Sequence, residues 1–72
     1  MIHLNTEREY LPLYCLLVLA GITKDQSQAR RILIQSIVYL NGQIISSFNK
    51  EVRTAGELDL DIGDKTYKIK FE

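Results

Sequence analysis

The sequence has little of several residue types on which protein function often depends. Its 72 residues include one cysteine, one proline, one histidine and no tryptophan. The single cysteine, Cys15, excludes an intramolecular disulfide and favours a reducing compartment, so we expect a cytoplasmic protein. The longest apolar run, from Leu11 to Ala20, contains Pro12 and is too short to span a bilayer. We therefore expect no contact with a membrane.

The chain also lacks the residue combinations of common catalytic and metal sites. His3 has no cysteine or serine arrangement that it can activate, and neither a phosphate-binding glycine loop nor a CxxC pair occurs. Asp59 and Asp61 are two residues apart in an expected strand and therefore lie on the same face of it. They lie opposite Lys68 and Lys70, and cross-strand ion pairing explains them without a metal. We expect a protein that is not an enzyme and that uses no cofactor, metal or small-molecule substrate.

A net charge is absent as well, because nine Lys and Arg residues balance nine Asp and Glu residues. The distribution is uneven: residues 1–53 hold six basic and four acidic side chains, and residues 54–72 hold three basic and five acidic ones. A dipolar surface follows, with a modest basic region around the second of the two helices predicted below. The length and the ordinary globular composition predict one small domain over residues 1–72.

Two helices are indicated in the first half of the chain. Pro12 suits the first turn of a helix and Gly21 suits the residue just past its end, which predicts a helix over about 12–20. Asp25 is a favourable N-cap for a second helix over about 25–35. The first helix is apolar on all sides, so we expect part of its surface to remain uncovered.

The second half of the chain shows strand and turn signals. Asn41-Gly42 is typical of a type I′ hairpin turn, and Gly63-Asp64 marks a second hairpin. We expect a short strand near residues 2–5 and a loop over 48–56. The main strands are predicted over about 37–41, 43–46, 57–62 and 65–71. Two helices followed by hairpins predict an α+β domain with one small, mostly antiparallel sheet.

Basic residues around the second helix are the candidates for phosphate binding. Arg30 and Arg31 carry planar guanidinium groups, which form bidentate, charge-assisted bonds with phosphate. Lys24, at the beginning of the same helix, extends this patch. A solvated helix face without a partner explains the same residues, so the residues alone leave both interpretations open.

A series of short motifs carries a resemblance to a known family. The motifs are Leu16-Leu17, Leu19-Ala20-Gly21-Ile22, Ala29-Arg30, Leu33-Ile34 and Val38-Tyr39-Leu40-Asn41-Gly42. In this order they resemble the RNA-binding domain named for the fourth protein of the small ribosomal subunit, here called the S-four domain, whose fold is the alpha-L RNA-binding motif. The similarity covers about residues 2–71 and is greatest to the stand-alone bacterial branch.

The resemblance implies a non-catalytic, ribosome-associated module that binds structured RNA of the ribosomal or transfer RNA class. Arg30 matches a basic position of the family's second helix, and Lys50 matches one in the loop after the hairpin. The RNA-binding candidates are Lys24, Arg30, Arg31, Lys50 and Arg53. Other basic positions of the family are replaced here, for example by Val18 and Glu51. Because affinity depends on phosphate neutralisation, we expect weak and steeply salt-sensitive binding.

An alternative hypothesis assigns the chain to protein binding. Apolar residues occupy the outer face of the first predicted helix, where members of the S-four family carry polar ones. Together with an aromatic residue of the later loop, they would form the interface of a homodimer or of a complex with a partner protein. The residues of this predicted apolar interface are Leu11, Cys15, Val18, Leu19 and Phe48.

Overall fold

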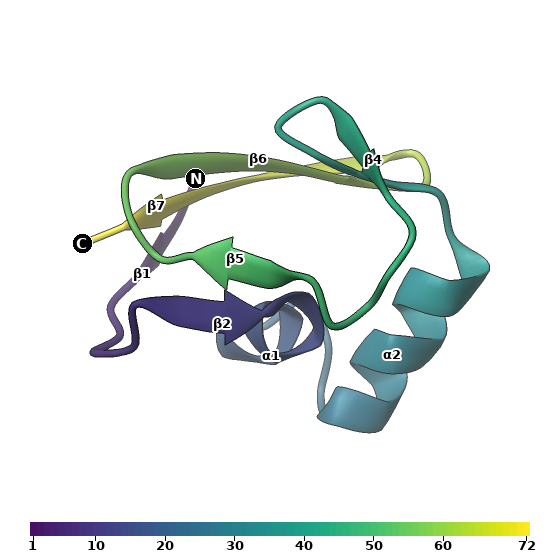
Figure 1. Cartoon of the computed structure of the whole chain (residues 1–72), viewed down its shortest axis with the longest axis horizontal. Coiled ribbons are helices and arrows are strands. Elements are labelled where there is room, and N and C mark those ends of the chain that lie inside the picture. Colours follow the sequence, from purple (N-terminus) through teal and green to yellow (C-terminus); the bar gives the residue numbers. More distant parts are fainter.

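The computed structural model describes all residues, 1–72, and arranges them in two layers (Figure 1). One layer is a five-stranded sheet of β1 (Ile2–Leu4), β3 (Val38–Leu40), β4 (Gln43–Ile45), β6 (Glu57–Ile62) and β7 (Lys65–Phe71). The other layer holds helices α1 (Leu13–Leu19) and α2 (Gln26–Gln35) and a small sheet of β2 (Tyr10–Pro12) and β5 (Glu51–Arg53). The predicted α+β class is confirmed.

The large sheet has the strand order β1-β7-β6-β3-β4. All neighbouring strands are antiparallel except β1 and β7, which are parallel and pair Ile2 with Ile69. Both predicted hairpins are present. Asn41 and Gly42 have φ angles of 50° and 84°, as a type I′ turn requires. In the second turn only Gly63 has a positive φ, of 61°, which is the pattern of a type II′ turn.

The hydrophobic core lies between the two layers. Leu60 and Ile69 of the sheet are completely buried against the helices. The helices contribute Leu13, Leu16, Leu17, Ala29 and Leu33, all of them buried. No helix of the structure has the length and apolar character needed to cross a membrane.

The structure contains two short strands that the sequence analysis does not predict. The region expected to be a loop over 48–56 includes β5, and β2 precedes α1. Leu11 and Val52 lie directly opposite each other in this small sheet and are only 6% and 4% exposed. The expectation of one sheet is therefore wrong, since a second, two-stranded sheet is present. Each of its strands has three residues, which are too few to show a recognisable alternating pattern in the sequence. Pro12 ends β2 and is the N-cap of α1 rather than part of its first turn.

The end of α1 shows why Gly21 was correctly placed just past a helix. The Gly21 N–H donates to the Val18 carbonyl and the Ile22 N–H donates to the Leu17 carbonyl, both at 3.0 Å. These two bonds define a Schellman motif, in which the residue after the C-cap is left-handed. The φ of Gly21 is 77°, a value that costs glycine little because it has no Cβ.

The beginning of α2 is fixed by two side chains that cap the backbone reciprocally. Asp25 Oδ1 accepts a hydrogen bond from the Gln28 N–H at 2.8 Å, which confirms the predicted N-cap. Gln28 Oε1 in turn accepts from the Lys24 N–H at 2.7 Å. The arrangement is a variant of the capping box, with the second bond made one residue before the N-cap. The two bonds fix the angle between α2 and the loop before it. They thereby help to position the two arginines of that helix.

The face of the large sheet that points away from the helices is polar. Lys68 lies opposite Asp59, with 3.5 Å between Nζ and Oδ1, so this predicted ion pair is confirmed. Asp61 lies opposite Thr66 and accepts a hydrogen bond from its hydroxyl at 2.7 Å. Lys70 is opposite neither aspartate, and the prediction that it pairs with one of them is wrong. The register of the second hairpin decides this outcome.

Candidate nucleic-acid interface

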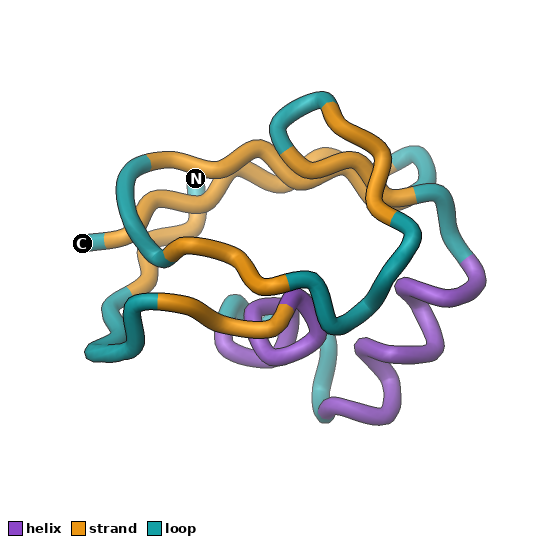
Figure 2. The backbone as a smooth tube through the Cα atoms, viewed as in Figure 1, coloured by secondary structure: helices purple, strands orange, loops and turns teal.

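The loop between β4 and β5 turns back at the beginning of α1 (Figure 2). Pro12 makes no side-chain hydrogen bond at the N-cap, so the first N–H groups of α1 need other acceptors. The Leu13 N–H donates to the Lys50 carbonyl at 2.8 Å, and the Tyr14 N–H donates to the Phe48 carbonyl at 3.1 Å. The loop carbonyls thus replace a capping side chain and hold Phe48 and Lys50 beside α1.

Arg30 of α2 lies against two aromatic rings of this region. Its guanidinium carbon Cζ is 4.6 Å from the centroid of the Tyr14 ring and 5.7 Å from that of the Phe48 ring. The two rings meet edge to face, with centroids 5.8 Å apart and planes inclined by 62°. Both distances from Cζ fall within the range of cation–π attraction. Arg30 therefore joins α2, α1 and the loop at one point.

Three predicted RNA-binding residues, Lys24, Arg31 and Arg53, are exposed and make none of the aromatic contacts that hold Arg30. Arg31 follows Arg30 on α2, and Lys24 precedes the N-cap of that helix. Arg53 is in β5, opposite Tyr10. The structure thus brings Arg30 and Lys50 to the beginning of α1 and leaves Lys24, Arg31 and Arg53 on the surface of neighbouring elements.

All five of these basic side chains lack a carboxylate partner. Lys68 forms an ion pair with Asp59, and the His3 ring contacts the Glu72 carboxylate; neither contact involves one of these five residues. The positive charges near α1 and α2 are therefore not neutralised within the protein. Exposed, unpaired guanidinium and ammonium groups attract phosphate, and Arg30 is the one among them whose position is fixed by contacts.

Tyr14 belongs to this site although no pattern in the sequence predicts it. Tyr14 precedes Arg30 by sixteen residues and Phe48 follows it by eighteen, so no helical or strand spacing links them. The missed feature depends on the loop bonding to α1, which is a tertiary contact. Gln28 is different, since a glutamine three residues after an N-cap aspartate is a local signal that could have been used.

The structure places the residues of the predicted apolar interface at different depths. Leu11 lies in β2 and is buried, so its placement on the outer face of the first helix is wrong. Cys15 is partly buried and its sulfur lies 3.9 Å from a side-chain amide nitrogen at the start of α2. Val18 and Phe48 also pack against the core, which leaves only Leu19 substantially exposed, at 45%. A protein partner stays a prediction.

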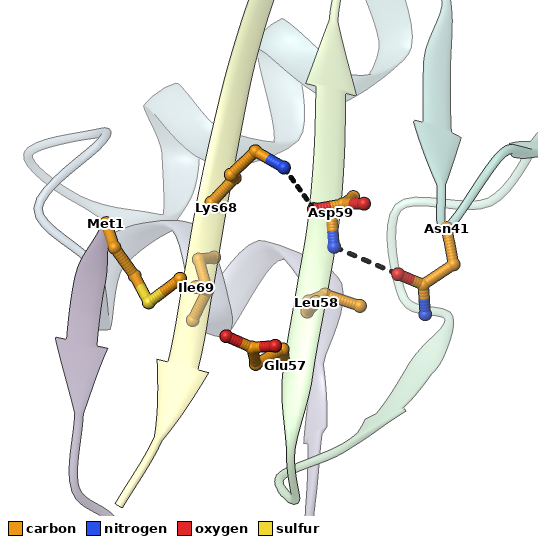
Figure 3. A pocket seen from close by; sticks show the side chains of 7 residues that line it. All are labelled: Met1, Asn41, Glu57, Leu58, Asp59, Lys68 and Ile69. Carbon is orange, nitrogen blue, oxygen red and sulfur yellow. Dashed lines mark hydrogen bonds and ion pairs between the residues drawn. The ribbon is translucent and has the colours of Figure 1, made fainter.

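A hollow of about 170 Å³ lies on the polar face of the large sheet (Figure 3). It is lined by Met1, Asn41, Glu57, Leu58, Asp59, Lys68 and Ile69. Three of its polar residues already bond to one another: Lys68 pairs with Asp59, and the Asp59 N–H donates to Asn41 Oδ1 at 2.9 Å. These bonds tie the first hairpin to β6 and β7, which is a structural role. No group of three or more His, Cys, Asp or Glu side chains is placed to hold a metal ion.

Comparison with known proteins adds one similarity. The chain is 42% identical over 57 residues to a tyrosine--tRNA ligase of Syntrophotalea carbinolica. The aligned segment is 78% of this chain and 14% of the ligase, so the chain spans a small part of that curated relative. No protein-family model matches the chain. The name of this relative specifies an enzyme that acts with transfer RNA.

Proposed function

We propose that this chain is a non-catalytic RNA-binding domain of the S-four type, which binds structured RNA of the ribosomal or transfer RNA class in the cytoplasm. The residues that contact phosphate are Lys24, Arg30, Arg31, Lys50 and Arg53. The domain uses no cofactor, and its ligand is recognised mainly through the charged backbone of a folded RNA.

The observation that carries this proposal is the arrangement of Arg30 and Lys50. The guanidinium of Arg30 is held by two rings, and the backbone carbonyl of Lys50 accepts a hydrogen bond from the first N–H of α1, which places Lys50 beside that helix. Both residues are exposed, and neither has a carboxylate partner. The similarity to a segment of a ligase whose name specifies transfer RNA supports the same class of ligand.

The number of basic residues determines how binding should respond to salt. Each phosphate contact releases counterions, and five contacts correspond to a slope of log affinity against log salt of roughly −3.5 to −4.5. Affinity should therefore fall by roughly 50- to 140-fold when the salt concentration rises threefold. The isolated domain therefore binds RNA weakly at physiological salt. A larger fraction of it is bound where the RNA concentration is high.

The proposal is tested by fluorescence anisotropy with a fluorescein-labelled transfer RNA transcript, titrated at about 50 mM and about 150 mM salt. The test variant combines Arg30→Ala with Arg31→Ala. The matched control combines Lys68→Ala with Lys70→Ala, which removes the same charge from the opposite face of the sheet. An unlabelled single strand of the same length, used as competitor, measures the preference for folded RNA.

We expect salt-dependent binding that is strongly weakened in the arginine variant and unchanged in the lysine variant. The slope of log affinity against log salt should also be less steep for the arginine variant, by the amount that two lost phosphate contacts would remove. If the two variants lost affinity equally, attraction would come from overall charge and the assigned face would be wrong. If the unmodified chain showed no binding at the lower salt concentration, the RNA-binding proposal itself would fail.

A further inference from the structure

The contacts of Arg30 distinguish it from every other basic residue of the chain. Its guanidinium carbon lies over the ring of Tyr14 and near that of Phe48, at 4.6 and 5.7 Å from the centroids. Arg31, the next residue on α2, has no aromatic contact of this kind and no ion pair. The N–H groups of Arg30 form no ion pair within the chain, so they remain available to an external acceptor.

We infer that Tyr14 and Phe48 are positioning residues for Arg30, which hold its guanidinium so that its N–H edge meets a phosphate oxygen of the bound RNA. This inference rests on the proposed function. Cation–π attraction acts through the face of an aromatic ring, whereas the hydrogen-bond donors of a guanidinium lie in its own plane. An arginine can therefore keep a ring contact while it donates to phosphate.

The supporting scaffold explains why the two rings can act in this way. Phe48 is tied to Tyr14 through the backbone bond from the Tyr14 N–H to the Phe48 carbonyl, at 3.1 Å. Both residues are partly buried and pack against the hydrophobic core. A side chain that is already held loses less rotamer freedom when it binds. The rings thus increase the affinity contributed by Arg30 without adding a charge.

The same geometry argues against direct stacking of an RNA base on Tyr14. The Arg30 guanidinium occupies the space over the Tyr14 ring, and the edge-to-face contact with Phe48 uses a further part of its surface. A base would have to displace the arginine to stack on that face of the ring. Tyr14 therefore acts through Arg30, and the interface is expected to read the RNA backbone rather than its bases at this point.

Anisotropy titrations with the labelled transfer RNA transcript test the inference through a double-mutant comparison. We expect Tyr14→Leu to weaken binding by about two- to fivefold, the amount that an exposed cation–π contact provides, with an unchanged salt slope. Tyr14→Phe keeps the ring and should bind like the unmodified chain. Arg30→Ala should bind more weakly. Its slope of log affinity against log salt should be less steep by about 1, the change expected for one lost phosphate contact. Adding Tyr14→Leu to Arg30→Ala should cause no further loss.

Controls separate positioning from folding and from RNA binding in general. Tyr39→Leu changes an exposed tyrosine of β3, outside the Arg30 contacts, and should leave affinity unchanged. Thermal melting identifies a variant that fails to fold, and Phe48→Leu provides the same comparison from the other ring. Additive losses in the double variant, or normal binding by Tyr14→Leu, would overturn the positioning role alone. Absence of binding by the unmodified chain would overturn the proposed function and this inference with it.

Discussion

Replacing Asp25 by alanine is expected to destabilise α2 at its first turn. The Asp25 carboxylate accepts from the Gln28 N–H at 2.8 Å, and no other side chain takes this bond. Losing an N-cap of this kind costs about 1 kcal/mol, within a range of roughly 0.5–2 kcal/mol. For a domain of this size, about 1 kcal/mol corresponds to a fall in melting temperature of roughly 4–8 °C. The total stability is on the order of 4–11 kcal/mol, so the change is measurable.

The assay is thermal unfolding followed by circular dichroism, with Asp25→Ser as the matched control. Serine retains an oxygen acceptor at the N-cap and should melt within a few degrees of the unmodified chain. Hydrogen exchange at the Gln28 amide gives a local readout, because this N–H loses its protein partner in the alanine variant. Faster exchange at Gln28 should accompany the lower melting temperature.

A double-mutant cycle with Gln28→Ala examines the reciprocal bond. Gln28 Oε1 accepts from the Lys24 N–H at 2.7 Å, and the two capping bonds share the Gln28 residue. The destabilisations should therefore be coupled by about 0.5 kcal/mol or more rather than add independently. An unchanged melting temperature and unchanged Gln28 exchange in Asp25→Ala would refute the capping argument, since solvent would then satisfy the first turn equally well.

Three further changes have expected outcomes that follow from burial and backbone geometry. Leu60→Ala leaves a cavity at a completely buried position and should cost about 2–5 kcal/mol in chemical denaturation, a large part of the total stability. Gly21→Ala meets no atom within 4 Å, but its φ of 77° should make it destabilising by about 1 kcal/mol in the same assay. Lys68→Ala breaks an exposed pair with Asp59 and should change stability by less than about 1 kcal/mol; a larger effect, or one insensitive to salt, would contradict the solvent-screened interpretation of this pair.

Local signals allowed much of the fold to be predicted from the sequence. Helix α2 follows from Asp25 and its amphipathic pattern, and the first hairpin follows from Asn41-Gly42, whose φ angles are both positive. The alternating residues of β6 and β7 likewise indicate half-buried strands. In each case, the determining information lies within a few consecutive residues, so the neighbouring sequence fixes the local conformation.

The features that the sequence analysis missed depend on contacts between distant segments. Leu11 continues an apolar run into α1, and a short apolar segment does not by itself distinguish a strand from a helix. Its place in β2 is decided by pairing with Val52, forty-one residues later in the chain. The candidate site shows the same limit. Arg30 is recognisable as a basic residue, but its contact with Tyr14 exists only after the β4–β5 loop has bonded to α1.

From the parallel pairing of β1 with β7 we expect that these two strands pair late in folding. Ile2 lies opposite Ile69, and the Glu72 N–H donates to the Leu4 carbonyl at 2.8 Å, so this pairing closes a loop of nearly the whole chain. Long loops are entropically costly to close, whereas the β6–β7 hairpin brings together neighbours and can form within microseconds. During synthesis, β1 leaves the ribosome long before β7 exists. The backbone donors and acceptors of β1 therefore stay unpaired until β7 has formed. The pairing of these two strands then completes one edge of the large sheet.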